Sequence, residues 1–179
     1  MNVEEQLTQM FENHNCPDYK WIDPALINVC QWVRFKCQWG CNNYGVRANC
    51  PPNVPSVEHC QQFLSEYSQA VIFHFRRACT TREERYEWTA QINAELQAIE
   101  REVFLSGYYK AFALFVDACH LCDECAGSRK DCLQKMTSRP APDALGIDVY
   151  QAARSVGYHI EVLTDPAQEM DRYGFLLIE

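Results

Sequence analysis

Hydrophobic residues recur along this chain with two different spacings, and each spacing predicts a kind of element. Apolar positions three or four residues apart predict helices over residues 3–13, after Ser56 and, over a longer stretch, after Thr81. Ser56 is a good N-cap residue, and Thr81 forms a capping box with the glutamate three positions later. A further short helix is expected to begin after Asp148.

Strands are predicted where apolar residues alternate with polar ones or run without a break. A short alternating stretch follows Val29, and the uninterrupted runs AVIFHF and YKAFALFV follow the two longer predicted helices. Together the patterns predict five strands, over residues 29–36, 70–75, 109–116, 159–163 and 173–178. Segments rich in proline and glycine, at 37–55 and 133–147, are expected to be loops.

The order of these elements predicts an α+β fold. After residue 69 the order is strand, long helix, strand, cysteine-rich loop, short helix, strand and strand. This order predicts a mixed β-sheet with helices packed on one face and two cysteine-rich metal-binding loops next to its strands. We expect residues 1–179 to form a single domain, with a helical amino-terminal extension over 1–28 and a core over 29–179.

Composition and charge exclude several classes of partner. A chain of 179 residues that is 47% hydrophobic can bury a core, and its net charge of −8 argues against binding to a nucleic-acid backbone. The amino terminus lacks the pattern of a secretory signal, and no apolar run is long enough to span a membrane. We therefore expect a cytoplasmic protein without a membrane or nucleic-acid partner.

The eleven cysteines are the unusual feature of the composition. In a reducing cytosol this density indicates metal binding or redox chemistry rather than disulfides. Three cysteines, Cys16, Cys30 and Cys79, are not assigned as ligands. The other eight fall into an amino-terminal group, Cys37, Cys41, Cys50 and Cys60, and a carboxy-terminal group, Cys119, Cys122, Cys125 and Cys132.

The carboxy-terminal group has the more diagnostic spacing, C-x2-C-x2-C-x6-C. Two residues between thiolates let the backbone curl around a compact iron–sulfur cluster, and such runs are typical of ferredoxins. Zinc sites more often use two separated C-x2-C pairs, so the spacing favours iron–sulfur over zinc. The usual ferredoxin run differs in its fourth cysteine, which follows after three residues and precedes a proline, whereas Leu133 follows Cys132 here.

The amino-terminal group is less diagnostic. Gly40 permits a tight turn and Pro51 stiffens the approach to Cys50. Cys60 lies in the first turns of the helix after Ser56, where the helix dipole favours a thiolate, but it also fits the apolar face of that helix as a core residue. Zinc is a more serious alternative to iron–sulfur at this site.

These motifs together resemble one family. The segments WVRFKCQWGCNNYGVRANCPPNVPS, SGYYKAFAL, CHLCDEC, RPAPDALGIDVYQAARSVGY and YGFLLIE resemble the cysteine-rich domain of unknown function 2284, described as a predicted metal-binding protein. The resemblance runs from about Val29 to Glu179, and its cysteine motifs fall on the two groups of four given above. It implies metal binding, with iron–sulfur chemistry in oxygen-poor cells, and it implies no substrate.

Three functions remain open at this point. An iron–sulfur protein with one or two [4Fe-4S] clusters would transfer electrons or give redox support to a partner enzyme, and its negative charge would steer it toward a basic redox partner. Alternatively, a cluster serves an enzyme acting on a small molecule by sulfur or group transfer, with Arg47 or His74 as candidate polar groups. In the third, zinc ions staple the loops of a structural or interaction module.

Overall fold

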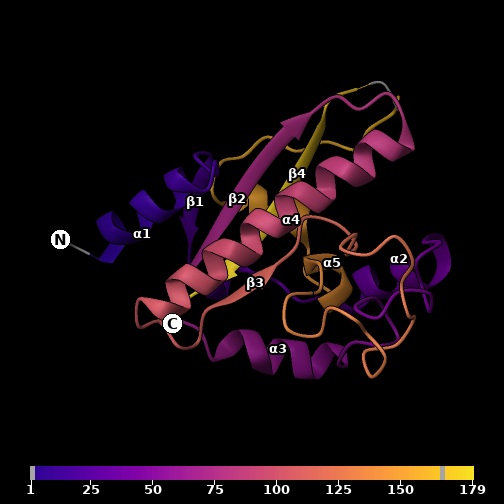
Figure 1. The fold of residues 1–179 in the computed structure, drawn as a ribbon, viewed down its shortest axis with the longest axis horizontal. Helices are drawn as coiled ribbons and strands as arrows, with labels where there is room; N and C mark the ends of the chain where they lie inside the picture. Colours follow the sequence, from indigo (N-terminus) through magenta and orange to yellow (C-terminus); the bar gives the residue numbers. More distant parts are fainter. Residues whose placement is uncertain (1–2, 166–167) are drawn as a thin grey trace.

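The computed structural model describes residues 3–165 and 168–179 and shows an α+β fold around one sheet, which confirms the predicted class (Figure 1). The elements, in chain order, are α1 (Val3–Asn13), β1 (Tyr19–Ile22), the 3-10 helix η1 (Pro24–Leu26), α2 (Gln31–Gly40), α3 (Val57–Ser65), β2 (Ala70–Arg77), α4 (Arg82–Leu105), β3 (Phe112–Leu114), α5 (Pro142–Leu145), α6 (Val149–Ser155) and β4 (Met170–Leu177).

The sheet has the strand order β1-β2-β4-β3, and every neighbouring pair is antiparallel. The central pair is β2 with β4, in register from Ala70 opposite Leu177 to Arg77 opposite Met170. The prediction of a mixed sheet was therefore wrong. Strand polarity depends on how the connections cross in space, and the periodicity of a single strand carries no information about its neighbours.

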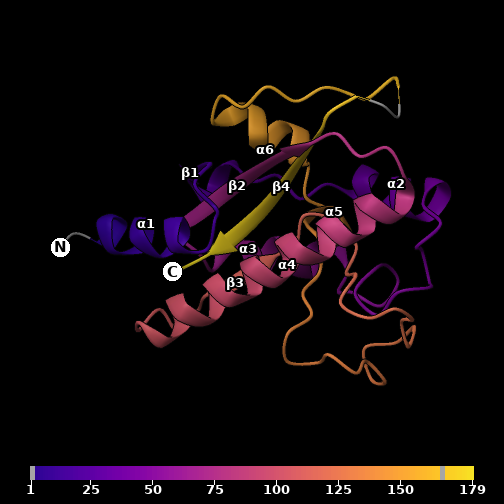
Figure 2. The same cartoon turned by 45° about the horizontal axis from the view of Figure 1, so that its top comes forward.

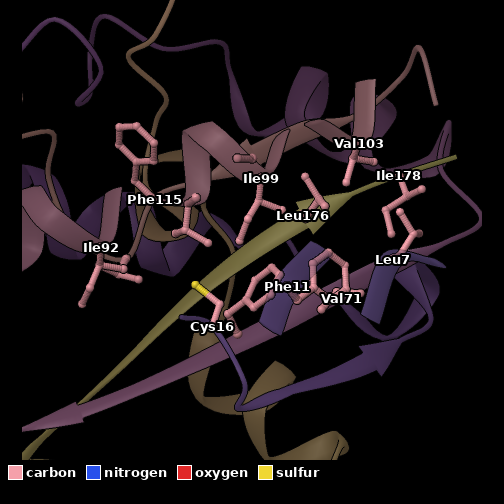
Figure 3. Packing of buried hydrophobic residues seen from close by; sticks show 14 of the residues in the cluster. Leu7, Phe11, Cys16, Val71, Ile92, Ile99, Val103, Phe115, Leu176 and Ile178 are labelled. Atoms are coloured by element: carbon pink, nitrogen blue, oxygen red, sulfur yellow. The ribbon is translucent and has the colours of Figure 1, made fainter. Parts of the chain in front are cut away.

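One face of the sheet packs against α1 and α4. Alternate residues of β2, such as Val71, point to this side and meet Leu7 and Phe11 from α1 and Ile99 from α4, all four of them fully buried. Figure 3 shows these side chains together with others of α4 and β4. The amphipathic patterns of the two helices thus decide which of their faces covers the sheet.

The other face packs against α3 and α6. The intervening residues of β2, such as Ile72, point to this side and join Leu64 from α3 and Ala153 from α6 in a second core. In Figure 2 the strands β2 and β4 lie between α6 and α4. The prediction of helices on one face was therefore wrong, because both faces of the two central strands are apolar and both need cover.

Local signals predicted most of the helices. The side chains of Ser56, Thr81 and Asp148 cap α3, α4 and α6, and Thr81 completes its capping box with Glu84. The first 28 residues, expected as a helical extension, also contribute strand β1, and Phe11 lies in the first core.

The main error lies in the strand predicted over residues 29–36, because residues 31–36 belong to helix α2 and Val29 makes only an isolated bridge to Ile147. Val33 and Cys37, one helical turn apart, are the buried residues of α2, while Trp32 and Phe35 are half exposed. The buried positions of this segment therefore follow the period of a helix, and the alternation of apolar residues that predicted a strand does not match them. Two further differences are that residues 159–163 form no strand and that α5 lies inside the loop predicted over 133–147.

Among the described residues, none of the helices combines the length and the apolar character needed to cross a bilayer.

Candidate metal centre

Six of the eight cysteines lie on two long loops at the same end of the molecule, on the right in Figures 1 and 2, while Cys37 lies in α2 and Cys60 in α3. The amino-terminal loop, residues 41–56, connects α2 to α3, and the carboxy-terminal loop, residues 115–141, connects β3 to α5. Both loops leave elements that are packed into the two cores, so their ends are held in place.

Four hydrogen bonds join the loops, and in each the donor belongs to the amino-terminal loop. The bonds run from Arg47 Nη1 to Cys119 O (2.8 Å), from Ala48 N to Cys125 Sγ (3.3 Å), from Asn49 Nδ2 to Arg139 O (2.7 Å) and from Asn53 Nδ2 to Gly127 O (2.9 Å). The stretch between Arg47 and Asn53, which contains Cys50, therefore lies against the loop that carries the other cysteines.

The four thiols of the carboxy-terminal group are close enough to influence one another's ionisation. Burial raises the pKa of Cys122, and the charges of Cys132 and Cys125 raise it further. Burial also raises the pKa of Cys119, with further contributions from Cys122 and Cys132. Thiolates gathered in this way repel one another, so a cation among them would favour their ionised form.

Cys132 differs from Cys119 and Cys122 of the same group. Burial works against its ionisation, but hydrogen bonds from the Ser138 hydroxyl and the Gln134 backbone N–H, with the positive charge of Arg129, lower the pKa of the thiol below its usual value. Arg129 Nη1 lies 3.9 Å from the sulfur. Cys132 is thus better prepared than Cys119 or Cys122 to enter a metal site as a thiolate.

In the amino-terminal group, Cys37 and Cys41 line one pocket together with Asp143. Cys37 lies in the last turns of α2, Cys41 directly follows that helix, and Cys37 Sγ lies 3.8 Å from the backbone oxygen of Asp143 in α5. Burial, followed by the charges of Asp143 and Cys41, raises the pKa of Cys37 to about 11. The same causes in the same order raise the pKa of Cys50 to about 12.

Asp143 was not among the residues singled out from the sequence. The residue is exposed, but partial desolvation of its carboxyl by the protein, followed by the charge of Asp117, raises its pKa to about 6. A single aspartate in a loop-like segment carries no signal of its own. Only the packing of α5 against α2 brings it to the thiols.

Cys60, the fourth cysteine of the amino-terminal group, lies in the hydrophobic core. It is 1% exposed, lies in the second core with Leu64, and its Sγ is 3.7 Å from the carbonyl oxygen of Pro55. Burial raises the pKa of Cys60, while the nearby charge of Arg34 opposes the shift. Cys60 thus occupies the core position that its helix face equally predicted, and its role as a ligand stays a prediction.

Within residues 3–165 and 168–179, no three His, Cys, Asp or Glu side chains lie in the arrangement that holds a single metal ion. The thiols are gathered into two groups without being drawn around one point.

The candidate groups for an enzyme take structural positions. Both ring nitrogens of His74 bind carboxylates, Nδ1 to Asp18 (2.6 Å) and Nε2 to Asp171 (2.8 Å), which leaves neither nitrogen free to shuttle a proton. The guanidinium of Arg47 donates hydrogen bonds to Asn43 Oδ1 and to the backbone oxygen of Cys119. The second of these bonds joins the two loops.

His120 lies between two cysteines of the carboxy-terminal group and packs on Tyr86, with 4.2 Å between the ring centroids. Burial, followed by the charge of Arg47, lowers the pKa of His120 to about 4. The imidazole is therefore neutral near pH 7 and stacks on the Tyr86 ring.

A comparison with protein families gives one match. The model of the family described as "Predicted metal-binding protein (DUF2284)" matches residues 20–178, which include all eight cysteines of the two groups. No curated protein and no solved structure gives a significant match. The family match supports a metal-binding role for the chain.

Proposed function

Because the chain belongs to the family described as "Predicted metal-binding protein (DUF2284)", we propose that it binds one or two [4Fe-4S] clusters through cysteine thiolates and transfers electrons to or from a partner protein. The observation that carries this proposal is the meeting of two cysteine groups at one end of the fold, joined by hydrogen bonds from one loop to the other.

The carboxy-terminal group is the first proposed cluster site. Its donors are soft thiolates, which suit iron–sulfur clusters better than hard oxygen-preferring ions. Hydrogen bonds to the sulfurs are one means by which proteins set the potential of such clusters. Three of the four sulfurs accept a backbone N–H: Cys119 from Leu121, Cys125 from Ala48 and Cys132 from Gln134.

The amino-terminal group, Cys37, Cys41, Cys50 and Cys60, is the second proposed site. Here too a backbone N–H is directed at a sulfur, from Asn43 to Cys41 Sγ at 3.4 Å. When bound, each cluster would accept and release single electrons. The chain's own contribution is to hold the thiolates, direct amide N–H groups at them and keep the two sites together.

The distance between the two sites supports electron transfer. Ala48, whose N–H lies 3.3 Å from Cys125 Sγ, precedes Cys50 by two residues. Two residues span at most ~7 Å, so the backbone of Cys50 is within about 10 Å of a ligand of the other site. An electron arriving at one site would therefore have a short path to the other, and the net charge of −8 would attract a basic partner.

The decisive test is a count of iron and acid-labile sulfide, with a visible spectrum, on protein purified without oxygen. We expect about eight irons per chain and a broad brown absorption, as two cubane clusters would give. Cys122→Ala and Cys50→Ala should each remove about half of the iron. The control is Cys16→Ala, because Cys16 is a thiol buried against Phe11 and Phe73 in the first core.

The identity of the bound metal distinguishes the proposed electron-transfer function from a structural role with zinc. Colourless protein that carries zinc would overturn the iron–sulfur proposal and make the chain a structural module stapled by metal. Iron that stays unchanged in the Cys122→Ala variant would overturn the assignment of the carboxy-terminal site.

A further inference from the structure

We propose that a pocket between the two long loops binds a small organic carboxylate, with Arg129 as the group that holds the carboxylate. The pocket has a volume of about 300 Å3. Ligand sites in proteins span about 300–1,000 Å3, so a molecule at the small end of the range fits. This inference goes beyond the proposed function, because the pocket is built from side chains other than the cysteines.

The pocket is formed where the two loops meet. Its lining residues come from both loops, and Phe112 of β3 and Leu145 of α5 complete the wall. Two of the hydrogen bonds between the loops start from lining residues, Asn49 and Asn53. The contacts that join the loops therefore also fix the shape of the pocket before a ligand arrives.

The two arginines that line the pocket differ in their partners. Arg139 is paired with the carboxylate of Glu100. Within residues 3–165 and 168–179, no carboxylate forms an ion pair with Arg129. Arg129 is thus the one of the two whose positive charge is left for a carboxylate from outside the chain.

The hydrogen bonds of Arg129 leave part of its guanidinium free. Nη1 donates to the Ser138 hydroxyl and lies 3.9 Å from Cys132 Sγ, and Nη2 donates to the backbone oxygen of Lys135. In the described part of the chain Nε donates to no acceptor, so it remains for a ligand together with a second hydrogen of Nη2. Two such N–H groups side by side match the two oxygens of a carboxylate.

The rest of the wall favours an organic molecule over an inorganic anion. Val54, Pro55 and Pro140 line the pocket with carbon, and the ring of Phe112 lies 5.3 Å from Cζ of the paired Arg139. An inorganic phosphate would carry more than one charge and would leave oxygens against this apolar wall without donors. A molecule with one carboxylate and an apolar body suits both parts of the pocket.

A purely structural role for Arg129 is the competing explanation. The residue lies beside the carboxy-terminal group of cysteines, since Ser138, which accepts from Arg129, has its hydroxyl 3.5 Å from Cys132 Sγ. Arg129 could therefore serve only to hold this end of the loop. A structural role predicts no ligand, so a direct measurement of binding separates the two explanations.

The experiment measures the binding of radiolabelled benzoate to the full chain, purified without oxygen, by equilibrium dialysis. Benzoate is a small probe with one carboxylate on an apolar ring, and we expect one molecule per chain. Unlabelled benzoate should displace it, whereas benzamide, which has nearly the same shape without the charge, and inorganic phosphate should not. Each competitor is used at the same concentration.

Three variants locate the bound benzoate. Arg129→Gln should weaken binding by about 10–100-fold, because it removes a charged hydrogen-bonding partner. Val54→Phe should also weaken binding, since it fills part of the pocket and leaves the charges unchanged. The matched control is Lys130→Gln, which removes a positive charge next to Arg129 from a residue that does not line the pocket and should leave the affinity unchanged.

Several results would overturn the proposal. Wild-type protein that binds no benzoate is one, and equal losses in Arg129→Gln and Lys130→Gln are another, because they would indicate general attraction to a positive loop. Displacement by phosphate or benzamide as strong as by benzoate would be a third. Unchanged affinity in Val54→Phe would also overturn it, and this variant decides alone if circular dichroism shows that Arg129→Gln does not fold.

Iron counted in the same wild-type samples separates this inference from the proposed function. Full iron without bound benzoate would overturn the pocket assignment and leave the proposed clusters intact. Bound benzoate without iron would support the pocket and overturn the clusters.

Discussion

The ion pair between Glu100 and Arg139 ties the end of the carboxy-terminal loop to the long helix α4, and its removal gives the sharpest test of how the loop is held. The carboxylate of Glu100 accepts Arg139 Nε at 2.7 Å, Arg139 Nη2, and the backbone N–H of Ala113 in β3 at 2.7 Å. The side chains of Glu100 and Arg139 are only 9% and 15% exposed. One carboxylate thus joins a helix, a strand and a loop.

We expect Glu100→Ala to destabilise the fold by about 3–5 kcal/mol, because it leaves a nearly buried guanidinium without its counter-charge. The loss also removes the acceptor of the Ala113 N–H, in a buried part of the sheet. A change of this size is a large part of the roughly 5–15 kcal/mol that stabilises a typical domain. For a chain of this length it lowers the melting temperature by about 10 °C.

Urea unfolding followed by circular dichroism measures this change, and a double-mutant cycle with Arg139→Met isolates the pair. The double variant should be more stable than Glu100→Ala alone, since it contains no unpaired buried charge. The control is Glu102→Gln, in the same helix as Glu100. It removes a partly exposed carboxylate that binds His14, just after α1, and should cost less than about 1 kcal/mol. A loss below about 1 kcal/mol for Glu100→Ala would refute the reasoning, because it would mean that the guanidinium finds water or another partner.

Two further predictions concern the sheet. Gly174→Ala should destabilise the protein by about 1–3 kcal/mol in urea unfolding. The added Cβ would lie 2.6 Å from Leu96 Cδ1, and the nearby Leu114 O and Val116 Cγ1 leave the strand little room to move away. An unchanged free energy of unfolding would show that α4 can shift away from the sheet. Asp18→Asn should lower stability by under about 1 kcal/mol at pH 7, since hydrogen bonds from Tyr158 and His74 lower the pKa of this half-exposed carboxyl although burial opposes them. A lowered pKa stabilises the fold above the unfolded value of about 3.9, and that stability is lost as the pH falls through the folded pKa. The difference between Asp18→Asn and wild type should therefore vanish in acid, and a difference that stays constant down to about pH 2.5 would contradict this assignment.

Local sequence signals were sufficient for elements whose burial follows one regular period. The N-cap at Ser56 and the capping box at Thr81 located the starts of α3 and α4 because a cap is a contact between residues three positions apart. The apolar run beginning at Ala70 was sufficient for β2 because both of its faces are covered. The signals were insufficient at residues 29–36, where half-exposed Trp32 and Phe35 imitated the alternation of a strand.

The sequence by itself determined the α+β class, the two cysteine groups and their family resemblance, since composition, caps and short spacings are properties of neighbouring residues. Only the tertiary structure decided that the sheet is antiparallel with helices on both faces, that the two loops are bonded to each other, and that Cys60 lies in the core. Only the packing of α5 on α2 brings Asp143 to Cys37. These features are contacts between residues far apart in the chain, and they depend on the packing of whole elements rather than on any local pattern.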